Sequence, residues 1–428
     1  MEERRLLDAA AGFGGAEEAR SRGAERLRAE VAVAGLRGRG GAAFPLWTKW
    51  EAALARPGPR VVVVNGAEDE PGSLKDRYLL ATRPDLVVDG ALCTALALDA
   101  DRIVFYVNEE ADGPIGSTRA AIDAVDAPTA LDLVAAPAAY VFGEDSCAVE
   151  FIETGDRKAQ PRSKPPFPAE AGVGGRPTVV SNAETLAHVA LIARHGAEWF
   201  RQVGTPECPG TLLVTLPGEC ARPGVYEVAA GTPFADVLQH CGGGPAGAAL
   251  RGAQVGGPAA GWLTADGFDT PLSPEAMAAR GTMLGCAAVR LLCEDRCAVD
   301  AVAEVEAFFA AESCGKCPLC RAETQFFARA AGGLAGGKEV TVAHLDKAME
   351  LAEMARTTTD CALARFPAAP LRSGREHFPD DFAAHLAGDD CGRRHLGASP
   401  ASPEGTGAAS MAISGWPPPW FTPTEGTA

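Results

Sequence analysis

Four cysteines impose the strongest constraint on how this chain can fold. Cys314, Cys317 and Cys320 form a C-x2-C-x2-C run, and Cys361 lies in a separate segment further along the chain. A cubane iron–sulfur cluster needs four thiolates around its irons, and three from one tight loop plus one from a distant segment supply them. The pattern therefore favours a [4Fe-4S] cluster, and it obliges the fold to bring residues 314–320 and residue 361 together.

Two other interpretations of these cysteines remain open. Four thiolates also bind structural zinc, although zinc sites usually pair one C-x2-C with another. The four residues can also be ordinary thiols. The other nine of the 13 cysteines are scattered, and in a long cytosolic chain we expect most of them to be small buried hydrophobic residues rather than a disulfide framework. They are Cys93, Cys147, Cys208, Cys220, Cys241, Cys286, Cys293, Cys297 and Cys391.

Composition excludes several classes of protein. The chain has 428 residues, a net charge of −17 and 47% hydrophobic residues, enough for several large cores. Its acidic balance argues against a nucleic-acid partner. The sequence has no run of 18 apolar residues, and its first residues lack the apolar region of a signal peptide. We therefore expect a cytoplasmic protein without a membrane span, able to dock on a membrane complex.

The first half of the chain has the pattern of an α/β protein. Residues 1–34 predict one or two polar helices, and a glycine-rich stretch follows at 35–41. Residues 60–64 and 102–107 are buried-strand signals beside helix-like stretches. The acidic segment 65–70 leaves the first strand directly, where α/β proteins place ligands. The glycine stretch matches a dinucleotide fingerprint in letters only, because no strand precedes it, and a structural turn is an equal alternative.

The second half changes character twice. Residues 211–216 and 223–228 predict two strands, and 232–240 predict a short helix, an order that fits a β-grasp domain. Residues 298–390 are mostly helical, with amphipathic stretches at 298–312 and 339–356. Residues 391–428 are rich in Pro, Gly, Ser, Thr and Ala, and we interpret them as a disordered tail.

Five segments, taken together, resemble one family. They are Gly35 to Trp50, Asn65 to Asp76, Gly143-Glu144, Lys164 to Thr185, and Glu312 to Cys320 with Cys361. In this order they resemble the NADH-binding flavoprotein subunit of respiratory complex I and its homologues in NAD-linked hydrogenases and formate dehydrogenases. The resemblance implies an α/β multidomain fold, with an N-terminal helical segment (1–34), a Rossmann-like FMN/NADH domain (35–205), a β-grasp domain (206–296), a helical [4Fe-4S] domain (297–390) and the tail (391–428).

The resemblance also implies which residues hold the cofactors. The FMN-binding positions of the family correspond to Gly38, Arg39, Gly40, Lys49, Asn65, Glu68, Gly143, Asn182 and Thr185. The positions around NADH correspond to Phe44, Glu70, Tyr140, Glu144, Asp145, Lys164 and Phe167. The two phenylalanines match aromatic positions that stack on NADH, which suits a flat base. The cluster ligands correspond to Cys314, Cys317, Cys320 and Cys361.

Several residues depart from the family pattern. Ala67 replaces an Asp, Ser181 replaces an Asn, Asp145 replaces a Glu, and Ala52 stands where an aromatic residue often stacks on the NADH base. We therefore expect a divergent, stand-alone member of the family. Carboxylates at Glu144 and Asp145 predict a preference for NADH over NADPH, because they repel a 2′-phosphate.

The implied function is that of an NADH dehydrogenase of the diaphorase type. NADH reduces FMN by hydride transfer, and electrons leave singly through one [4Fe-4S] cluster to a partner, which is a ferredoxin-like protein or a complex I, hydrogenase or formate dehydrogenase subunit. The protein supplies placement and electrostatics, so no catalytic acid or base is expected. Two alternatives stay open: an assembly protein that binds the cluster but has lost NADH oxidation, and a zinc-stabilised scaffold.

Overall fold

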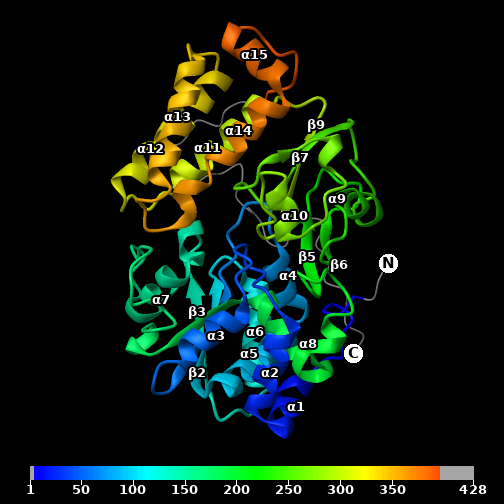
Figure 1. Ribbon diagram of the computed structural model, residues 1–428, viewed down its shortest axis with the longest axis vertical. Coiled ribbons are helices and arrows are strands. Elements are labelled where there is room, and N and C mark those ends of the chain that lie inside the picture. Colours follow the sequence, from blue (N-terminus) through cyan, green and yellow to red (C-terminus); the bar gives the residue numbers. More distant parts are fainter. Residues whose placement is uncertain (1–3, 396–428) are drawn as a thin grey trace.

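A four-stranded parallel sheet organises the first half of the chain in the computed structural model, which describes residues 4–395 (Figure 1). The strand order is β3-β2-β1-β4. The central strand β1 contains four consecutive valines, Val61–Val64, all fully buried. A parallel strand covered on both faces reads as such a continuous apolar run. The predicted strands at 60–64 and 102–107 are therefore confirmed as β1 and β2. The strands are β1 (Arg60–Gly66), β2 (Ala100–Asn108), β3 (Ala130–Ala136) and β4 (Thr178–Asn182).

Helices cover both faces of this sheet. Val62 and Val64 pack with α1, α2, α5 and α8, and the alternate residues Val61 and Val63 pack on the other face with α7. Residues 1–34, predicted to form one or two helices, form two, and both belong to this core. The helices are α1 (Gly14–Arg22), α2 (Ala24–Ala34), α3 (Leu46–Leu54), α4 (Lys75–Thr82), α5 (Pro84–Leu98), α6 (Asp112–Asp123), α7 (Asp145–Thr154) and α8 (Ala183–Phe200).

Two small antiparallel sheets follow, with a core of their own. Strands β5 and β6 form a hairpin, which confirms the two strands predicted there. The second sheet has the order β8-β7-β9. The predicted helix at 232–240 is one turn, α9, that continues as a wider π turn over residues 237–241. The elements are β5 (Thr211–Leu216), β6 (Gly224–Ala229), α9 (Phe234–Asp236), β7 (Leu250–Val255), β8 (Trp262–Leu263), α10 (Pro274–Ala279) and β9 (Val289–Cys293).

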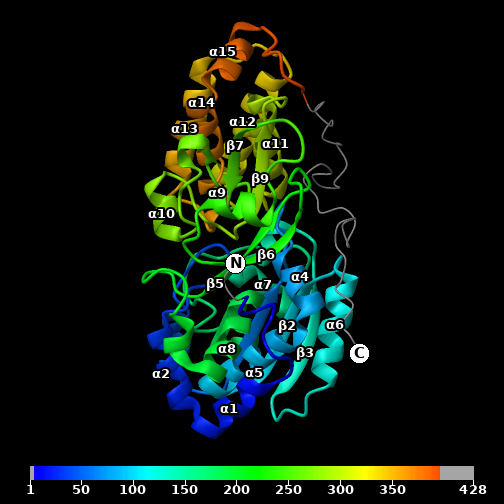
Figure 2. The same ribbon diagram turned by 90° about the vertical axis from the view of Figure 1, so that its right-hand side faces the viewer.

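Five helices make the last region, which stands above the parallel sheet along the long axis of the molecule (Figures 1 and 2). Both predicted amphipathic stretches are helical. A core of their apolar faces joins α11 to α12, α13, α14 and α15. The helices are α11 (Ala298–Glu312), α12 (Pro318–Ala335), α13 (Val342–Ala355), α14 (Ala368–His377) and α15 (Pro379–Ala387).

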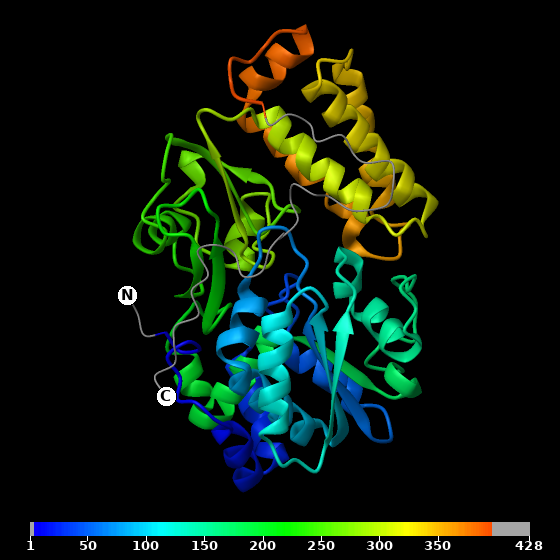
Figure 3. The same cartoon turned by 180° about the vertical axis from the view of Figure 1, so that it is seen from behind.

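The arrangement confirms the α/β multidomain class. Seen from behind, the small sheets and the helical region both lie above one end of the parallel sheet (Figure 3). Of the tail predicted at 391–428, residues 391–395 are described, and the prediction for the remainder lies outside the described residues. Within residues 4–395, no helix has the length and apolarity needed to cross a membrane.

Candidate functional site

A cavity of about 730 Å³ lies where the three regions meet. Asn65 and Asn182 line it from the carboxyl ends of β1 and β4, which are neighbouring parallel strands. Ligands of open α/β sheets bind at this edge of the sheet. The small-sheet region contributes residues such as Gly256, and the helical region contributes Cys361 and Phe366. Its volume is that of a site for a small molecule or cofactor.

Glycines form much of the cavity wall. Six of them line it, from four separate segments: Gly38, Gly40, Gly41, Gly143, Gly256 and Gly285. A side chain at Gly143 would meet one atom, Ala67 O, at 3.9 Å and would otherwise project into open space. Gly285 has φ +52°, and a Cβ there would lie 2.0 Å from Gly256 O. The backbone at Gly143 is thus open to a ligand that approaches closely, whereas Gly285 is a glycine because it packs directly against Gly256.

The glycine-rich loop is closed on itself and fastened to the rest of the chain. Gly38 N donates to Phe44 O at 2.9 Å, and Arg39 N donates to Thr185 Oγ1 at 2.9 Å. The Arg39 guanidinium is buried and donates to Thr211 O and to Pro209 O at 2.8 Å. Arg39 therefore holds the loop in place from behind, and its side chain does not line the cavity.

Lys49 brings a positive charge to the cavity from α3. Its Nζ lies 2.8 Å from Asp145 Oδ2 and donates to Val180 O at 2.9 Å. Next to Asp145, Glu144 is the N-cap of α7, and its carboxylate accepts from Ser146 N and from Cys147 N. Both carboxylates are thus already engaged, one by an ammonium group and one by a helix N-terminus.

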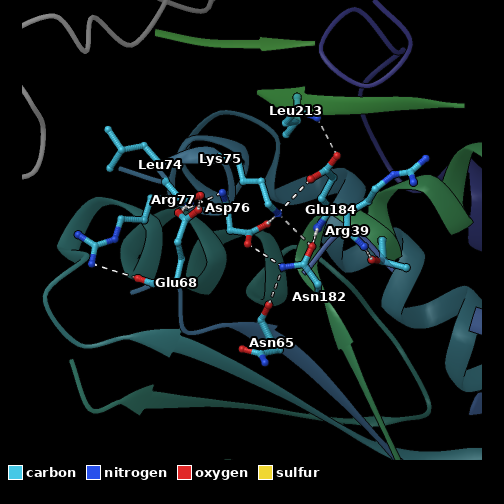
Figure 4. Close-up of polar contacts among 12 residues, drawn as sticks. Arg39, Asn65, Glu68, Leu74, Lys75, Asp76, Arg77, Asn182, Glu184 and Leu213 are labelled. Atoms are coloured by element: carbon cyan, nitrogen blue, oxygen red, sulfur yellow. Dashed lines mark hydrogen bonds and ion pairs between the residues drawn. The ribbon is translucent and has the colours of Figure 1, made fainter. Parts of the chain in front are cut away.

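A buried network of charges supports the other side of the cavity (Figure 4). Lys75 Nζ lies 2.9 Å from Asp76 Oδ1, 3.0 Å from Glu184 Oε2 and 3.2 Å from Asn182 Oδ1. Asn182 Nδ2 donates to Asp76 Oδ2 at 2.6 Å. Burial alone lowers the pKa of Lys75, but the neighbouring carboxylates outweigh it and raise that pKa. Lys75 is therefore charged, and it fixes the orientation of Asn182 at the end of β4.

Glu68 closes the same network by capping α4. Its Oε2 accepts from Asp76 N at 3.1 Å and from Arg77 N at 2.9 Å, and its Oε1 accepts from Ser73 Oγ. Burial raises the pKa of Glu68, and the nearby charge of Asp76 adds to this effect. Glu68 acts on the cavity mainly by holding the turn at residues 66–75.

Two further acidic groups have raised pKa values. Burial raises the pKa of Glu70 to about 7, although a hydrogen bond with Tyr140 opposes this. Burial also raises the pKa of Asp69 to about 7, with a contribution from the charge of Glu312. The Tyr140 ring packs edge-on against Phe308 of α11 at 5.4 Å between centroids. Tyr140 thus connects the cavity to the helical region.

The four cysteines of the sequence pattern converge between helix ends. Cys314 follows α11, Cys317 is the N-cap of α12, Cys320 lies in its first turn, and Cys361 directly precedes a short 3-10 turn (Ala362–Arg365). Burial, together with a smaller contribution from the neighbouring cysteines, raises the pKa of Cys320 to about 12 and that of Cys361 to about 11. Grouped thiols of this kind lose their protons when a metal compensates their charge.

The spacing of these sulfur atoms suits a cluster better than one zinc ion. Ligand atoms of tetrahedral zinc lie roughly 3.4–3.8 Å apart. Within residues 4–395, one group of three or more possible ligand residues has its ligand atoms within 4.8 Å of one another, and it contains none of these four cysteines. No three of their sulfur atoms are therefore as close together as zinc ligands are. Asp360 N points at Cys317 Sγ at 3.3 Å, and Ser313 Oγ lies 3.7 Å from Cys320 Sγ. Such hydrogen bonds to sulfur are typical of iron–sulfur sites.

Polar contacts fasten the cysteine loop to the cavity. Lys316 Nζ donates to Pro161 O at 2.6 Å and lies 2.9 Å from Asp360 Oδ2. Ser163 Oγ donates to Asp360 Oδ1 at 2.8 Å, and Gln160 Nε2 donates to Cys314 O at 3.2 Å. Cys361 itself lines the cavity. The four thiols and the glycine-walled cavity therefore share a boundary.

The structure brings most of the predicted site residues to one place. Those that line the cavity are Gly38, Gly40, Phe44, Lys49, Asn65, Glu68, Glu70, Tyr140, Gly143, Glu144, Asp145, Asn182, Thr185 and Cys361. Arg39, Lys164 and Phe167 are not part of the lining. Phe44 and Phe167 are nonetheless 45% and 46% exposed, so both rings are accessible for stacking on a planar ligand.

The sequence interpretation missed several residues of the site. Lys75 lines the cavity and Glu184 pairs with it from behind. Both are buried although charged residues are usually on the surface, so composition gives no signal for them. Gly256, Gly285 and Cys286 come from the small-sheet region, far along the chain from the sheet that provides the other wall. Only the packing of the two regions reveals them.

The donor set fits both cofactors. Four thiols grouped around a common space fit a [4Fe-4S] cluster. A glycine-walled cavity with an ammonium group at Lys49 fits a flavin mononucleotide. The Ser181 hydroxyl, which lines this cavity, is buried without a hydrogen-bond partner among the described residues. A buried hydroxyl of this kind suits a polar ligand.

Comparisons with known proteins give a consistent answer. The sequence model of the Nuo51 FMN-binding domain matches residues 31–191, that of the NADH-ubiquinone oxidoreductase-F iron-sulfur binding region matches 300–385, and that of the SLBB domain matches 213–262. The chain is 35% identical to the NADH-quinone oxidoreductase F subunit of Mycobacterium tuberculosis over 381 residues, covering 84% of each chain. It is 31% identical to the NADP-reducing hydrogenase subunit HndC of Solidesulfovibrio fructosivorans, covering 84% of this chain and 76% of that one.

A solved structure shares the same architecture. A chain of an NAD+-reducing [NiFe]-hydrogenase in the air-oxidised state superposes with a TM-score of 0.82 at 32% identity. The match covers 89% of this chain and 66% of that chain, just under two thirds of its length.

Proposed function

This chain belongs to the family of NADH-quinone oxidoreductase F subunits, and from that premise we propose that it is an NADH-oxidising, electron-input flavoprotein. When bound, FMN accepts a hydride from NADH, and one [4Fe-4S] cluster carries electrons away singly. The observation that carries the proposal is the shared boundary described above, because Cys361 lines the same cavity as Gly40 and Asn65. Chemistry at a flavin and exit through a cluster need this proximity.

We propose that the observed regions correspond to the family's domains. Residues 35–205 form the Rossmann-like FMN/NADH domain with the N-terminal helices of 1–34 packed on it. Residues 206–296 form the β-grasp domain and residues 297–390 the [4Fe-4S] domain. The two-stranded hairpin of β5 and β6 followed by α9 supports the β-grasp assignment.

For FMN, we assign separate tasks to two groups of residues. Gly38 and Gly40 offer backbone amides without side chains, and Lys49 offers an ammonium group, so this loop suits phosphate and ring together. Asn65 and Asn182 offer amides at the strand ends. Asn65 Nδ2 already donates to Gly143 O at 2.9 Å, which fixes the side chain before any ligand arrives.

For NADH, we assign the outer part of the cavity. Phe44 offers an exposed ring, and the Glu70 carboxyl lies beside Tyr140. Glu144 and Asp145 set negative charge at the rim, although Asp145 is paired with Lys49. Lys164 and Phe167 belong to the segment that joins the cavity rim to the cysteine loop. A rim of this charge disfavours a 2′-phosphate, so NADH is the preferred substrate.

The partner is a redox subunit or protein of the kinds found with the relatives, either of complex I or of a hydrogenase. We assign the exit to the cysteine loop, because its thiols are the proposed ligands of the cluster that carries single electrons. We expect a cytoplasmic protein that reaches a membrane only through such partners.

The test separates the two cofactors with two substitutions. Gly40→Val should prevent FMN binding and keep the cluster, because even a Cβ there lies 3.1 Å from Asn182 Cβ. Cys317→Ala should lose the cluster and keep FMN, because Cys317 is a proposed ligand outside the cavity lining. Flavin fluorescence of the heat-treated supernatant and iron content measure the outcome. Gly247→Val is the control, since nothing lies within 4 Å of its added Cβ.

Two results would contradict the proposal. Pure, cluster-loaded wild-type protein that yields no flavin on heating would show that this cavity is not a flavin site. An undiminished flavin content in Gly40→Val protein would place the flavin elsewhere. The absence of both cofactors would favour the zinc-stabilised scaffold, and a cluster without flavin would favour the assembly protein.

A further inference from the structure

A second group of cysteine and histidine residues lies at the outer end of the helical region. Cys297 is the N-cap of α11, His385 lies in α15, and Cys391 and His395 follow on the segment after α15. One ligand atom from each of the four lies within 4.8 Å of the others. The sequence pattern predicts isolated buried residues at the two cysteines, and nothing in their spacing of almost a hundred positions suggests otherwise.

The distances are those of a tetrahedral metal site. Cys297 Sγ lies 3.4 Å from His385 Nε2, and Cys391 Sγ lies 3.8 Å from His395 Nε2. Around a tetrahedral zinc ion with ordinary bond lengths, sulfur and nitrogen ligands lie roughly 3.6 Å apart. The two observed distances bracket this value. Four protein ligands also complete the coordination, as they do in structural rather than catalytic zinc sites.

The Nδ1 atom of each histidine, on the side of the ring away from the paired cysteine, faces an oxygen atom. His385 Nδ1 lies 3.0 Å from Leu334 O, so a proton on Nδ1 leaves the lone pair of Nε2 directed at Cys297. His395 Nδ1 lies 3.1 Å from Asp300 Oδ2, and Asp300 is buried. A carbonyl or carboxylate on the far nitrogen is the usual support for a histidine that binds zinc. Two independent supports of this kind point to a built site rather than a chance cluster.

The backbone also brings the segments together. Cys297 N donates to Arg394 O at 3.3 Å, and Arg394 N donates to Asp295 O at 2.7 Å, which forms a short parallel bridge. Gly392, with φ +71°, makes the turn between Cys391 and His395. The segment that follows α15 is thus laid against the start of α11, where the two pairs of ligands meet.

This group is separate from the [4Fe-4S] ligands. Cys297 begins α11, and Cys314 follows its far end. The helix has 15 residues, which corresponds to a length of about 22 Å. The two sets of thiols therefore lie at opposite ends of one helix and cannot share a metal.

We propose that Cys297, His385, Cys391 and His395 bind one structural Zn²⁺ ion that fastens residues 389–395 to α11 and α15. Binding converts two thiols to thiolates and releases two protons, so the charge of the ion is balanced by its own ligands. The site has no position left for a substrate. Its role is to hold the last described segment of the chain on the helical region.

Metal analysis of the purified, cluster-loaded protein tests the proposal. We expect one zinc per chain in addition to the cluster iron, either present after purification or taken up from one added equivalent of Zn²⁺ and retained against a weak chelator. Cys391→Ser and His395→Ala should lose the zinc and keep the iron, whereas Cys317→Ala should lose the iron and keep the zinc. Cys293→Ser is the matched control, because Cys293 is a buried thiol close to Cys297 in sequence and outside the site.

Two further readouts separate binding from folding. Asp300→Ala leaves all four ligands in place and should weaken zinc affinity about 10- to 100-fold. Co²⁺ in place of zinc should give the intense visible absorption of tetrahedral coordination, and Cys391→Ser should abolish it. The proposal is overturned if the protein neither contains nor takes up zinc, if Cys391→Ser keeps it, or if peptide mapping without reductant finds a disulfide between Cys297 and Cys391.

Discussion

Replacing Lys75 by Met removes the centre of the buried charge network in the cavity wall. Lys75 and its two carboxylate partners have side-chain exposures of 2%, 6% and 1%. At distances of 2.9 and 3.0 Å, each ion pair carries about 5–6 kcal/mol of Coulomb energy at an effective dielectric constant of about 20, before desolvation is subtracted. Breaking a buried pair by removing one partner typically costs about 3–5 kcal/mol, because the remaining charge stays buried.

An exposed pair in the same chain gives a matched control. Lys347 Nζ lies 2.9 Å from Glu350 Oε2, the same separation as in the buried pair, but the two side chains are 52% and 65% exposed. Surface pairs contribute less than about 1 kcal/mol. Lys347→Met should therefore be nearly neutral, so that the difference between the two variants measures what burial and the additional partners of Lys75 contribute.

Hydrogen exchange of peptides from α4 and α8 is the appropriate assay, because a chain with several cores need not unfold in one step. Lys75→Met should speed exchange in these helices about 10²- to 10⁴-fold, as a cost of about 3–5 kcal/mol implies, while Lys347→Met should not change it. The effect should be larger at pH 8 than at pH 5, because burial raises the pKa of Glu184 and protonation of this carboxyl in acid removes its unpaired charge. If both variants exchange at the wild-type rate at pH 8, the network does not stabilise the site as argued.

Three more predictions follow from other features. Gly285→Ala should reduce flavin binding far more than Gly281→Ala: both positions have positive φ, but only the Cβ at Gly285 meets a backbone oxygen, and equal flavin content would refute this. Burial raises the pKa of Glu323 from 4.5 to about 8, so the stabilisation of the neutral acid is lost as pH rises through 8. The thermal midpoint of the helical region should thus fall between pH 6 and pH 9, and Glu323→Gln should flatten that dependence; an unchanged slope would contradict it. The value of kcat/KM should favour NADH over NADPH, and equal or reversed values would overturn the rim assignment.

Local patterns predicted much of the fold. The four consecutive valines of β1 are a continuous apolar run typical of a buried strand, and the stretches of α11 and α13 have helical periodicity. Each formed the predicted element. The short helix at 232–240 was less well predicted, because its single α-helical turn widens into a π turn that only tertiary packing selects. The same packing places α1 and α2 in the core of the parallel sheet.

The candidate site was predictable only at residues whose type and spacing indicate a specific ligand. Closely spaced cysteines have few other uses, so Cys314 to Cys320 stood out, whereas the loop at Gly38 and Gly40 was assigned to a cofactor only through the family resemblance. Lys75 and Glu184 did not, because a buried charge is visible only with its partner. The Cys297 group was hidden for the same reason, since its ligands become neighbours through the bridge between residues 295–297 and 394.

An anaerobic titration with NADH tests the central claim most directly. The cofactor-loaded wild-type protein is mixed with increasing NADH while visible absorbance is recorded, and flavin and iron are quantified on the same sample. The account predicts one FMN per chain, bleached by about 1 to 1.5 equivalents of NADH, because FMN takes two electrons and the cluster takes one more. A fully loaded protein whose flavin spectrum does not change with excess NADH would contradict the account and favour an assembly protein that has lost NADH oxidation.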